Sequence, residues 1–493
     1  MKPVPTTAAR SDWSGREEVD TRAYAIAMKP GESASAAGSR TDAGEWTGRL
    51  ADALARHRVP GAALGILRDG VVSATAAGVL STATGVAATP DSLFQIGSLT
   101  KVWTATLVMQ LVDEGLVGLD TPVSEQLPGF RVADREVTRT VTPRHLLSHT
   151  SGIDGDVFTD TGRGDDCLER YVALLAEVEQ NHPLGATWSY CNSGYVLAGR
   201  LVEHVTGTTW DRALRERLVE PLGLGGTVTL AEEAILHRTA VGHVGEPDEE
   251  PRPTATWGPP RSAGPAGLIC GAVADVLAFA QLHLAGGVAP DGTRVVSAAA
   301  AEAMTGEEAR LPDRYSLGDS WGLGWIRFGW GDDRLVGHDG NTLGQAAFLR
   351  VLPSRGLAVS LLSNGGHATD LFQDVVREVF EEVAGATMQA PVRPSGSQIA
   401  VDSSQYVGRY ERTGVATEVF EGDGGLSLRS TITGELAELV PEPVHEYVLE
   451  PVEPDVFALR PPGVETWSAV TFYALADGAR YVHYGARANP LVG

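Results

Sequence analysis

The chain has 493 residues, of which 43% are hydrophobic and 21% charged, as in ordinary globular proteins with a sizeable core. Its length predicts two domains. The formal net charge is −24, from 63 acidic and 39 basic residues. Such an excess of negative charge repels nucleic acid and anionic membrane surfaces, so we expect neither as a partner.

The three cysteines are too few and too scattered for a disulfide framework, and no pair has a metal-ligand spacing. They are Cys167, Cys191 and Cys270. The first residues carry acids by position 17 and no apolar run of signal length. The most apolar helical stretch, 102–117, is interrupted by polar residues and is not expected to cross a bilayer. These features predict a protein of the reducing cytoplasm.

Residues 1–44 are rich in alanine, serine, glycine and threonine without a sustained period, which predicts a flexible arm. Trp46, Leu50 and Leu54 then recur at helical spacing. Two strands are expected at 62–67 and 71–75. Asp69-Gly70 between them is a strong signal for a β-hairpin.

A helix is predicted from Ser98 to Glu114, with Gly115 closing its C-terminus. The segment 120–310 is mostly helix and loop by its pattern. The later expected elements are strands at 323–328, 335–337, 346–351 and 358–362 and a helix at about 369–383. Strands at both ends of this region predict a sheet assembled from distant parts of the chain.

The segment 386–398 has two prolines, one glycine and no apolar period, which predicts a linker. Short alternating runs such as 425–429 and 480–484 predict a small antiparallel, barrel-like β domain over 399–493. The predicted fold is therefore α/β: a domain at 45–385 with an antiparallel sheet and a helical region, followed by a C-terminal antiparallel β domain.

The distribution of lysine is the most informative feature of the sequence. The chain has three lysines, Lys2, Lys29 and Lys101, and its other 36 basic residues are arginine. Lys101 is the sole lysine outside the predicted arm, and it follows Ser98 by three residues on one helix face. A desolvated lysine can release its proton whereas arginine cannot, so Lys101 is a candidate base for Ser98.

Three ordered motifs then resemble those of class C β-lactamases and their relatives, the DD-peptidases, D-aminopeptidases and family VIII esterases. They are Ser98-Leu99-Thr100-Lys101, Tyr190-Cys191-Asn192 and His338-Asp339-Gly340, which resemble S-x-x-K, Y-x-N and K-T-G or H-x-G. The His149-Thr150-Ser151-Gly152 segment agrees with the same superfamily of serine β-lactamase-like and penicillin-binding proteins. The resemblance covers about 46–385.

The resemblance implies a role for each matching residue. Ser98 would be the nucleophile, and Lys101 and Tyr190 would share the proton transfers. Asn192 would position the substrate and Lys101, and His338 would flank the oxyanion hole. The backbone N–H groups of Ser98 and Asn341 would form that hole, with Gly340 between His338 and Asn341 in the substrate-binding set.

The third motif departs from the β-lactamase pattern, because His338 stands where those enzymes keep a lysine that attracts the substrate carboxylate. A largely neutral imidazole is a weaker anchor for an anion. The departure favours esters, amides or peptides over β-lactams. His145 and His149 have the spacing of a zinc pair, but no Glu follows His145, so we expect no metal and no other cofactor.

Three functions remain open from the sequence. The first is a hydrolase whose acyl-enzyme is resolved by water, and the second is a transacylase that passes the acyl group to an amine or alcohol. The third is a catalytically silent binding protein, which the intact motifs disfavour. The partner is expected to be a small acyl substrate. Loops within 154–181 and 240–265 are expected to shape its pocket. The C-terminal domain is expected either to line the active-site mouth or to be a passive stabiliser.

Overall fold

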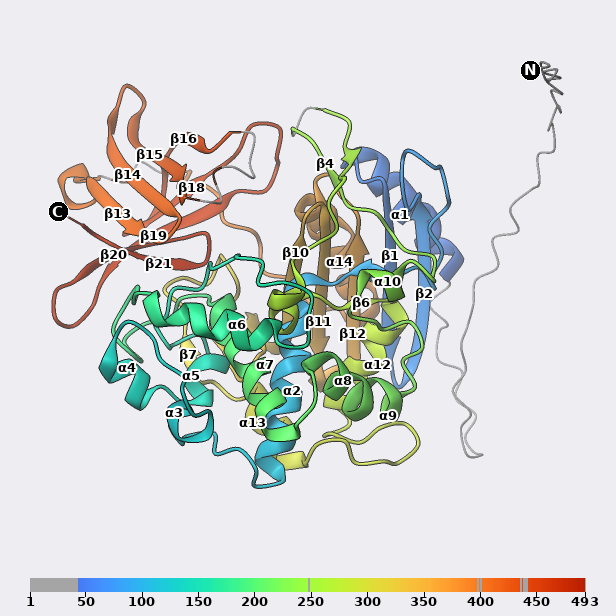
Figure 1. Cartoon of the computed structure of the whole chain (residues 1–493). Helices are drawn as coiled ribbons and strands as arrows, with labels where there is room; N and C mark the ends of the chain where they lie inside the picture. Colours follow the sequence, from blue (N-terminus) through green and yellow to red (C-terminus); the bar gives the residue numbers. More distant parts are fainter. Residues whose placement is uncertain are drawn as a thin grey trace, which may run out of the picture.

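The structure of the chain is a computed structural model that describes residues 43–246, 249–396, 399, 401–434, 437 and 442–492 (Figure 1). The arm predicted for 1–44 lies outside the described residues except for its last two. No helix in the described ranges is long and apolar enough to span a membrane.

An eight-stranded antiparallel sheet forms the centre of the molecule, with the strand order β2-β1-β12-β11-β10-β9-β8-β7. Its strands are β1 (Gly61–Arg68), β2 (Val71–Gly78), β7 (Ala309–Arg310), β8 (Ser320–Trp321), β9 (Ile326–Trp330), β10 (Asp333–Thr342), β11 (Gln345–Leu352) and β12 (Leu357–Ser363). The sheet thus joins the start of the folded chain to a segment almost 300 residues later, as the sequence pattern predicted.

The hairpin between β1 and β2 confirms its sequence signal. Arg68 pairs with Val71, so Asp69 and Gly70 alone form the turn. Both have positive φ, 50° for Asp69 and 80° for Gly70, which is the geometry of the type I′ turn that Asp-Gly favours.

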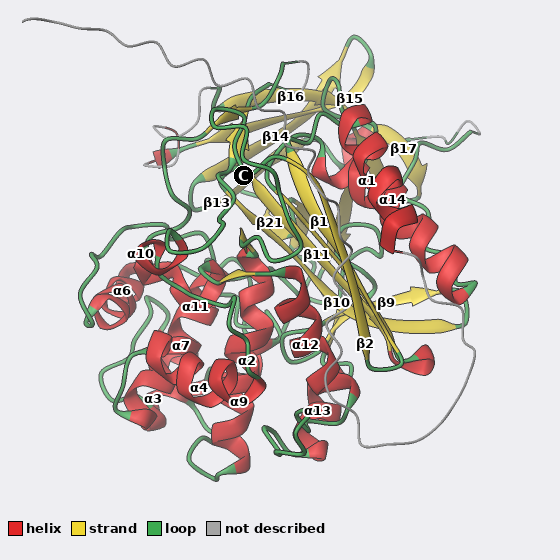
Figure 2. Ribbon diagram, turned by 90° about the vertical axis from the view of Figure 1, so that its right-hand side faces the viewer, coloured by secondary structure: helices red, strands yellow, loops and turns green. Residues whose placement is uncertain are grey.

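Helices cover both faces of the sheet (Figure 2). On one face lie α1 (Ala43–Arg56) and α14 (Ala368–Ala384), whose apolar side chains join one core. On the other lies a larger helical region with its own core. It contains α2 (Thr100–Asp113), α3 (Val123–Gln126), α4 (Arg135–Thr140), α5 (Pro143–Leu147), α6 (Cys167–Leu174), α7 (Asn192–Thr206), α8 (Trp210–Leu214), α9 (Glu220–Leu222), α10 (Ala231–Ala234), α11 (Gly264–Gly267), α12 (Val273–Leu284) and α13 (Ala298–Thr305).

Burial on both faces explains why the central strands are apolar runs rather than alternating ones. In β1, Ala62, Leu64 and Ile66 face the core under α1 and α14, whereas Ala63 and Leu67 face the helical region. Successive side chains of a strand point to opposite faces, so every position of a doubly covered strand must be apolar.

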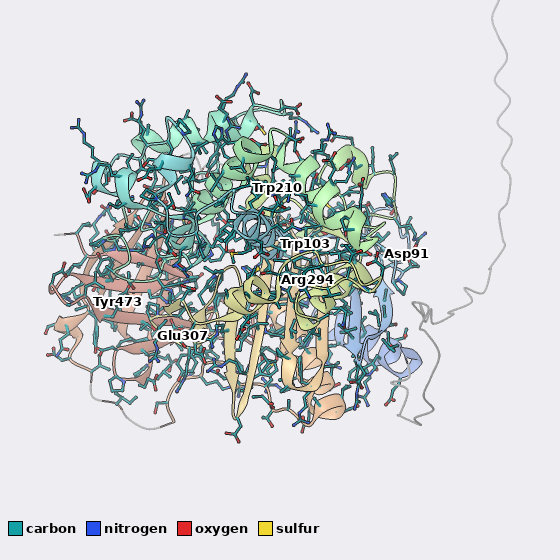
Figure 3. All side chains as sticks on the ribbon, turned by 90° about the horizontal axis from the view of Figure 1, so that it is seen from below. Asp91, Trp103, Trp210, Arg294, Glu307 and Tyr473 are labelled. Atoms are coloured by element: carbon teal, nitrogen blue, oxygen red, sulfur yellow. The ribbon has the colours of Figure 1, made fainter. Side chains whose placement is uncertain are left out.

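Tryptophan side chains fill the helical region. Trp103 on α2 stacks on Phe279 of α12 with ring centroids 3.9 Å apart. Trp103 and Trp210 are both 1% exposed, and Figure 3 shows both in the middle of the molecule when it is viewed from below. Two two-stranded sheets lie among the loops: β3 (Phe94–Gln95) with β6 (Cys270–Gly271), and β4 (His243–Val244) with β5 (Arg252–Pro253).

The structure corrects three details of the predicted elements. Ser98 lies in a 3₁₀ turn, Gly97–Leu99, and α2 begins only at Thr100. The strand expected at 335–337 extends through Thr342, because β11 pairs with it as far as Gln345. The strand expected at 323–328 begins at Ile326, since Gly324 adopts a φ of 92° in the turn from the short β8.

The C-terminal region forms two antiparallel sheets around one core (Figure 1, orange and red). One contains β13 (Gly408–Arg412), β14 (Val415–Gly422), β15 (Gly425–Ile432) and β16 (Val444–Val448), and the other β17 (Glu450–Glu453), β18 (Val456–Leu459), β19 (Ser468–Ala474), β20 (Arg480–Tyr484) and β21 (Arg487–Pro490). Only Leu449 separates β16 from β17, and a bridge between Tyr410 and Leu491 joins the opposite edges. The arrangement is barrel-like, as predicted.

The C-terminal sheets bind the first domain through buried carboxylates. Asp313 accepts hydrogen bonds from His483 Nδ1 at 2.8 Å and from the Thr471 hydroxyl at 3.2 Å. Asp370 accepts from the backbone N–H of Thr466 at 2.8 Å. Burial raises the pKa of Asp313, but His483 and the N–H groups of its own loop outweigh burial and lower it to about 2.

Replacing Asp313 with asparagine should therefore remove a pH-dependent part of the stability. A lowered pKa stabilises the fold above the ordinary aspartate value of 3.8, and this contribution is lost as the pH falls towards about 2. We expect Asp313→Asn to cost about 2 kcal/mol at pH 5 and much less near pH 2. Urea unfolding of both proteins across that range measures the difference. Asp332→Asn, in the exposed β9–β10 turn, is the control, and a pH-independent difference for Asp313→Asn would contradict the assignment.

Candidate active site

Ser98 lies where the chain turns from β3 into α2. A methyl group added to Gly97 would lie 2.6 Å from the amide nitrogen of Asn341, and one added to Gly340 would lie 2.8 Å from that of Ser98. Gly97 also has a φ of 51°, which glycine adopts at little cost. Two glycines thus let the backbone of 96–98 contact that of β10, so the amides of Ser98 and Asn341 come together.

Lys101, in the first turn of α2, is fully buried beside Ser98. Its Nζ lies 3.0 Å from the Ser98 Oγ and donates a hydrogen bond of 2.6 Å to the Ala266 carbonyl oxygen. The same Nζ lies 4.8 Å from the centre of the Tyr190 ring. One N–H is therefore held by a carbonyl, which leaves the amine free to face the serine hydroxyl.

Burial lowers the pKa of Lys101 well below its ordinary value, and the positive charge of Arg487 lowers it further. No salt bridge to Lys101 occurs among the described residues, and the Asp156 carboxylate raises its pKa by less than burial lowers it. A neutral amine next to a serine hydroxyl can act as a general base. The base role of Lys101 stays a prediction, and a neutral amine at this distance is what it requires.

Tyr190 lies on the segment that leads into α7, with its ring 4.3 Å from that of His149. Its hydroxyl is buried, and no hydrogen bond of ordinary geometry reaches it from the described residues. Burial raises the pKa of Tyr190, while the Ser98 hydroxyl and Arg487 oppose the rise. A neutral tyrosine hydroxyl beside the nucleophile can donate a proton to a leaving group.

Asn192 is the first residue of α7. The Sγ of the preceding Cys191 accepts a hydrogen bond of 3.2 Å from the Gly194 N–H, as an N-cap. The Asn192 side-chain amide donates a 3.3 Å hydrogen bond to Asp156. Asn192 also lines the same cavity as Ser98 and Tyr190.

His338 lies on β10 and is 1% exposed. Its Nδ1 lies 2.6 Å from the carbonyl oxygen of Asp339, and because a carbonyl only accepts, Nδ1 carries the proton. Burial, with the nearby Lys101, lowers the pKa of His338 to about 3. The side chain is thus a neutral imidazole whose Nε2 can accept a hydrogen bond and cannot serve as a cationic anchor.

The structure adds Arg487, which the sequence analysis missed. It lies at the tip of the β20–β21 hairpin and lines the cavity with Ser98. Its guanidinium lies 5.0 Å from the centre of the Tyr190 ring and donates two hydrogen bonds to Asp156, at 2.7 and 3.1 Å. Nothing in the local sequence of the hairpin indicates such a position, because only the packing of the two domains creates it.

Asp156 is the link between Arg487 and the first domain. Arg412, from β13, contacts the same carboxylate at 2.7 Å. Burial raises the pKa of Asp156, but the two guanidinium groups lower it below its ordinary value. The β20–β21 hairpin of the C-terminal sheets therefore lines the cavity that contains Ser98.

The cavity around Ser98 has a volume of about 340 Å³. The predicted loop region 154–181 contributes Val157, Phe158 and Tyr171 to its lining, and the region 240–265 contributes Pro259 and Ala263. Most of the lining is apolar, and the polar groups converge near Ser98. That combination is typical of small-molecule sites.

Two other candidates from the sequence have structural explanations. His145 Nδ1 lies 3.2 Å from the Thr142 N–H in a capping box at the start of α5. The Nδ1 of His149 accepts a 2.9 Å hydrogen bond from the Cys191 N–H. Within the described part of the chain, no group of three histidine, cysteine or acidic side chains could hold a metal ion.

Comparisons with known proteins give one family. The family model described as Beta-lactamase matches residues 46–383. Penicillin-binding protein 4 of Amycolatopsis lactamdurans is 50% identical over 377 residues, which cover 76% of this chain and 99% of that protein.

Solved structures agree with this result. The crystal structure of SurE superimposes with a TM-score of 0.72 at 28% identity and covers 91% of this chain and 99% of SurE; its complex with D-Leu gives 0.70. D-amino acid amidase from Ochrobactrum anthropi SV3 gives 0.57 at 26% identity, over 68% of this chain and 99% of that one. The predicted fold class, including the likeness to β-lactamases, is confirmed.

Replacing Lys101 with arginine should abolish turnover and leave the fold intact. Guanidinium stays protonated throughout the working pH range and cannot take the Ser98 proton. We expect a loss of at least about a thousandfold in kcat/KM, on the order of 4 kcal/mol. Release of nitrophenol from an activated ester measures this loss, and circular dichroism and Tm serve as controls for folding.

The pH profile of the unaltered enzyme tests the same assignment. Because the pKa of Lys101 is lowered, its amine should be neutral well below the pH at which an exposed lysine titrates. As the pH is raised, kcat/KM should therefore reach its plateau below that pH. Near-normal turnover by Lys101→Arg, or a rate that rises only where an ordinary lysine titrates, would leave Tyr190 as the candidate base.

Proposed function

Because the chain belongs to the beta-lactamase family, we propose that it is a serine hydrolase that forms an acyl-enzyme on Ser98 from an amide, ester or peptide substrate. One observation carries the proposal. The amine of Lys101, buried without a carboxylate partner, lies 3.0 Å from the Ser98 hydroxyl inside a cavity of about 340 Å³.

In the proposed acylation step, the Ser98 Oγ attacks the acyl carbon while its proton passes to the Lys101 Nζ. The N–H groups of Ser98 and Asn341 donate to the carbonyl oxygen as it gains negative charge. Tyr190 then donates its hydroxyl proton to the leaving nitrogen or oxygen as the bond to the acyl carbon breaks, and it regains a proton from Lys101. Ser98 is left as an ester.

In the second step, an acceptor attacks that ester and Lys101 and Tyr190 work in reverse. Water gives hydrolysis, and an amine or alcohol gives a new amide or ester. The same residues serve both outcomes, so the product mixture with and without an added amine identifies the acceptor.

The relatives favour an acyl group that ends in a D-amino acid. SurE was solved with D-Leu and shares 28% identity over 91% of this chain. D-amino acid amidase, whose name states its substrate, shares 26% identity. The lining of the cavity includes Val157, Phe158 and Val196, whose apolar side chains suit an aliphatic or aromatic side chain of the substrate.

A nitrophenyl ester of N-acetyl-D-leucine should acylate Ser98 faster than the L-enantiomer, by about tenfold or more, because a chiral pocket fits one configuration of the side chain better. Intact-mass measurement counts the adducts, and peptide mapping locates them.

Ser98→Ala is the matched control and should show no adduct. Modification of Cys167, Cys191 or Cys270 in place of Ser98 would contradict a serine mechanism. Equal rates for the two enantiomers would leave the mechanism standing and remove the proposed D-preference.

Benzylpenicillin should be turned over far more slowly than the D-leucine ester. The penicillin carboxylate needs a cation near β10, and His338 is neutral there. The Arg487 guanidinium is already held by both oxygens of Asp156. Steady-state rates on the two substrates test this, and hydrolysis of benzylpenicillin at the ester's rate would overturn it.

A further inference from the structure

A second cavity, of about 480 Å³, lies between the first domain and the C-terminal sheets. One wall comes from β9, β11 and α14 and contains Phe328, Phe348 and Phe372. The opposite wall comes from the start of β19 and the β20–β21 hairpin and contains Trp467, Ser468 and Tyr484. The cavity therefore lies on the face of the main sheet that α14 covers.

This cavity adjoins the one around Ser98. Leu317, Asp339, Asn341 and Ala486 line both. In the register of the sheet, β9 pairs with β10 only as far as Gly337. Among the described residues, no strand pairs with that edge of β10 beyond Gly337, and the two cavities meet there beside Asn341, whose amide belongs to the proposed oxyanion hole.

Seven of the 26 residues that line the second cavity are aromatic, and the lining carries little net charge. Arg350, 4% exposed, forms two hydrogen bonds with the Asp339 carboxylate and lies over the Phe328 ring at 4.1 Å. Its charge is thus matched within the wall. Hydroxyl and amide side chains, such as Ser468 and Gln373, lie among the rings, which suits a ligand that has polar backbone groups as well as apolar side chains.

We propose that this cavity binds the distal residues of a peptide acyl donor whose last residue enters the cavity around Ser98. The inference rests on the proposed acyl-enzyme function and extends it from a small acyl group to a peptide several residues long. Aromatic walls and scattered hydrogen-bonding groups fit a peptide with apolar side chains, whereas an alkyl chain would make no use of the polar groups.

Three nitrophenyl esters that share one reacting residue test the proposal. They are N-acetyl-D-leucine, a hexapeptide of apolar residues ending in D-leucine, and N-dodecanoyl-D-leucine. Release of nitrophenol gives kcat/KM for acylation of Ser98 by each. We expect the hexapeptide ester to exceed the acetyl ester at least tenfold, and the dodecanoyl ester to gain much less.

Ser468→Trp should fill the cavity from its exposed wall and lower the ratio of the hexapeptide rate to the acetyl rate about tenfold. Ser404→Trp is the matched control, since it changes an exposed serine of the same domain that lines neither cavity, and its ratio should stay that of the unaltered enzyme. Trp467→Ala is the second variant and should also lower the ratio, by removing an aromatic wall.

Acylation by the acetyl ester separates the two proposals. If this ester does not acylate Ser98, the acyl-enzyme function itself is contradicted. If it does, equal rates for the acetyl and hexapeptide esters would overturn the peptide subsite. An equal gain for the dodecanoyl ester would overturn the peptide in favour of a lipid-like chain. A loss by Ser468→Trp only in transfer to an added acceptor peptide would overturn the assignment to the donor.

Discussion

The burial of Lys101 is the constraint on which the site depends. A lysine excluded from water and without a carboxylate partner is more stable neutral than charged, and the proposed role of Lys101 as a base for Ser98 requires that neutral form. The groups around its amine are uncharged: the carbonyl oxygen of Ala266 and the rings of Tyr190 and Tyr195. A carboxylate at the same distance would stabilise the ammonium form and remove the base.

A second basic side chain, Arg487, influences the protonation of Lys101. Arg487 lines the cavity around Ser98, and its positive charge disfavours protonation of Lys101. Its own charge is balanced by Asp156, which is also paired with Arg412. Both arginines come from the C-terminal sheets and the aspartate from the first domain, so the electrostatics of the site exist only when the two domains are packed together.

Sequence patterns predicted most of the first domain because its signals are local. The Asp69-Gly70 hairpin, α14 and the Ser98–Lys101 spacing each follow from neighbouring residues. Arg487 could not be predicted, since its place in the site depends on a contact between segments more than 300 residues apart. The length of β10 was underestimated for a related reason: Asp339 to Thr342 have no apolar alternation, and their pairing with β11 makes them a strand.

Backbone strain gathers around Tyr190. Five described non-glycine residues have positive φ, and two of them, His149 and Ala486, hold this segment. The His149 carbonyl oxygen accepts a hydrogen bond from the Ser189 N–H, and His149 Nδ1 accepts one from the Cys191 N–H. The Ala486 carbonyl oxygen accepts one from the Tyr190 N–H. Such conformations cost about 1 kcal/mol or more each and persist only where other contacts fix them. Here three consecutive backbone N–H groups fix them, so the tyrosine is positioned through its backbone and its hydroxyl stays free for proton transfer.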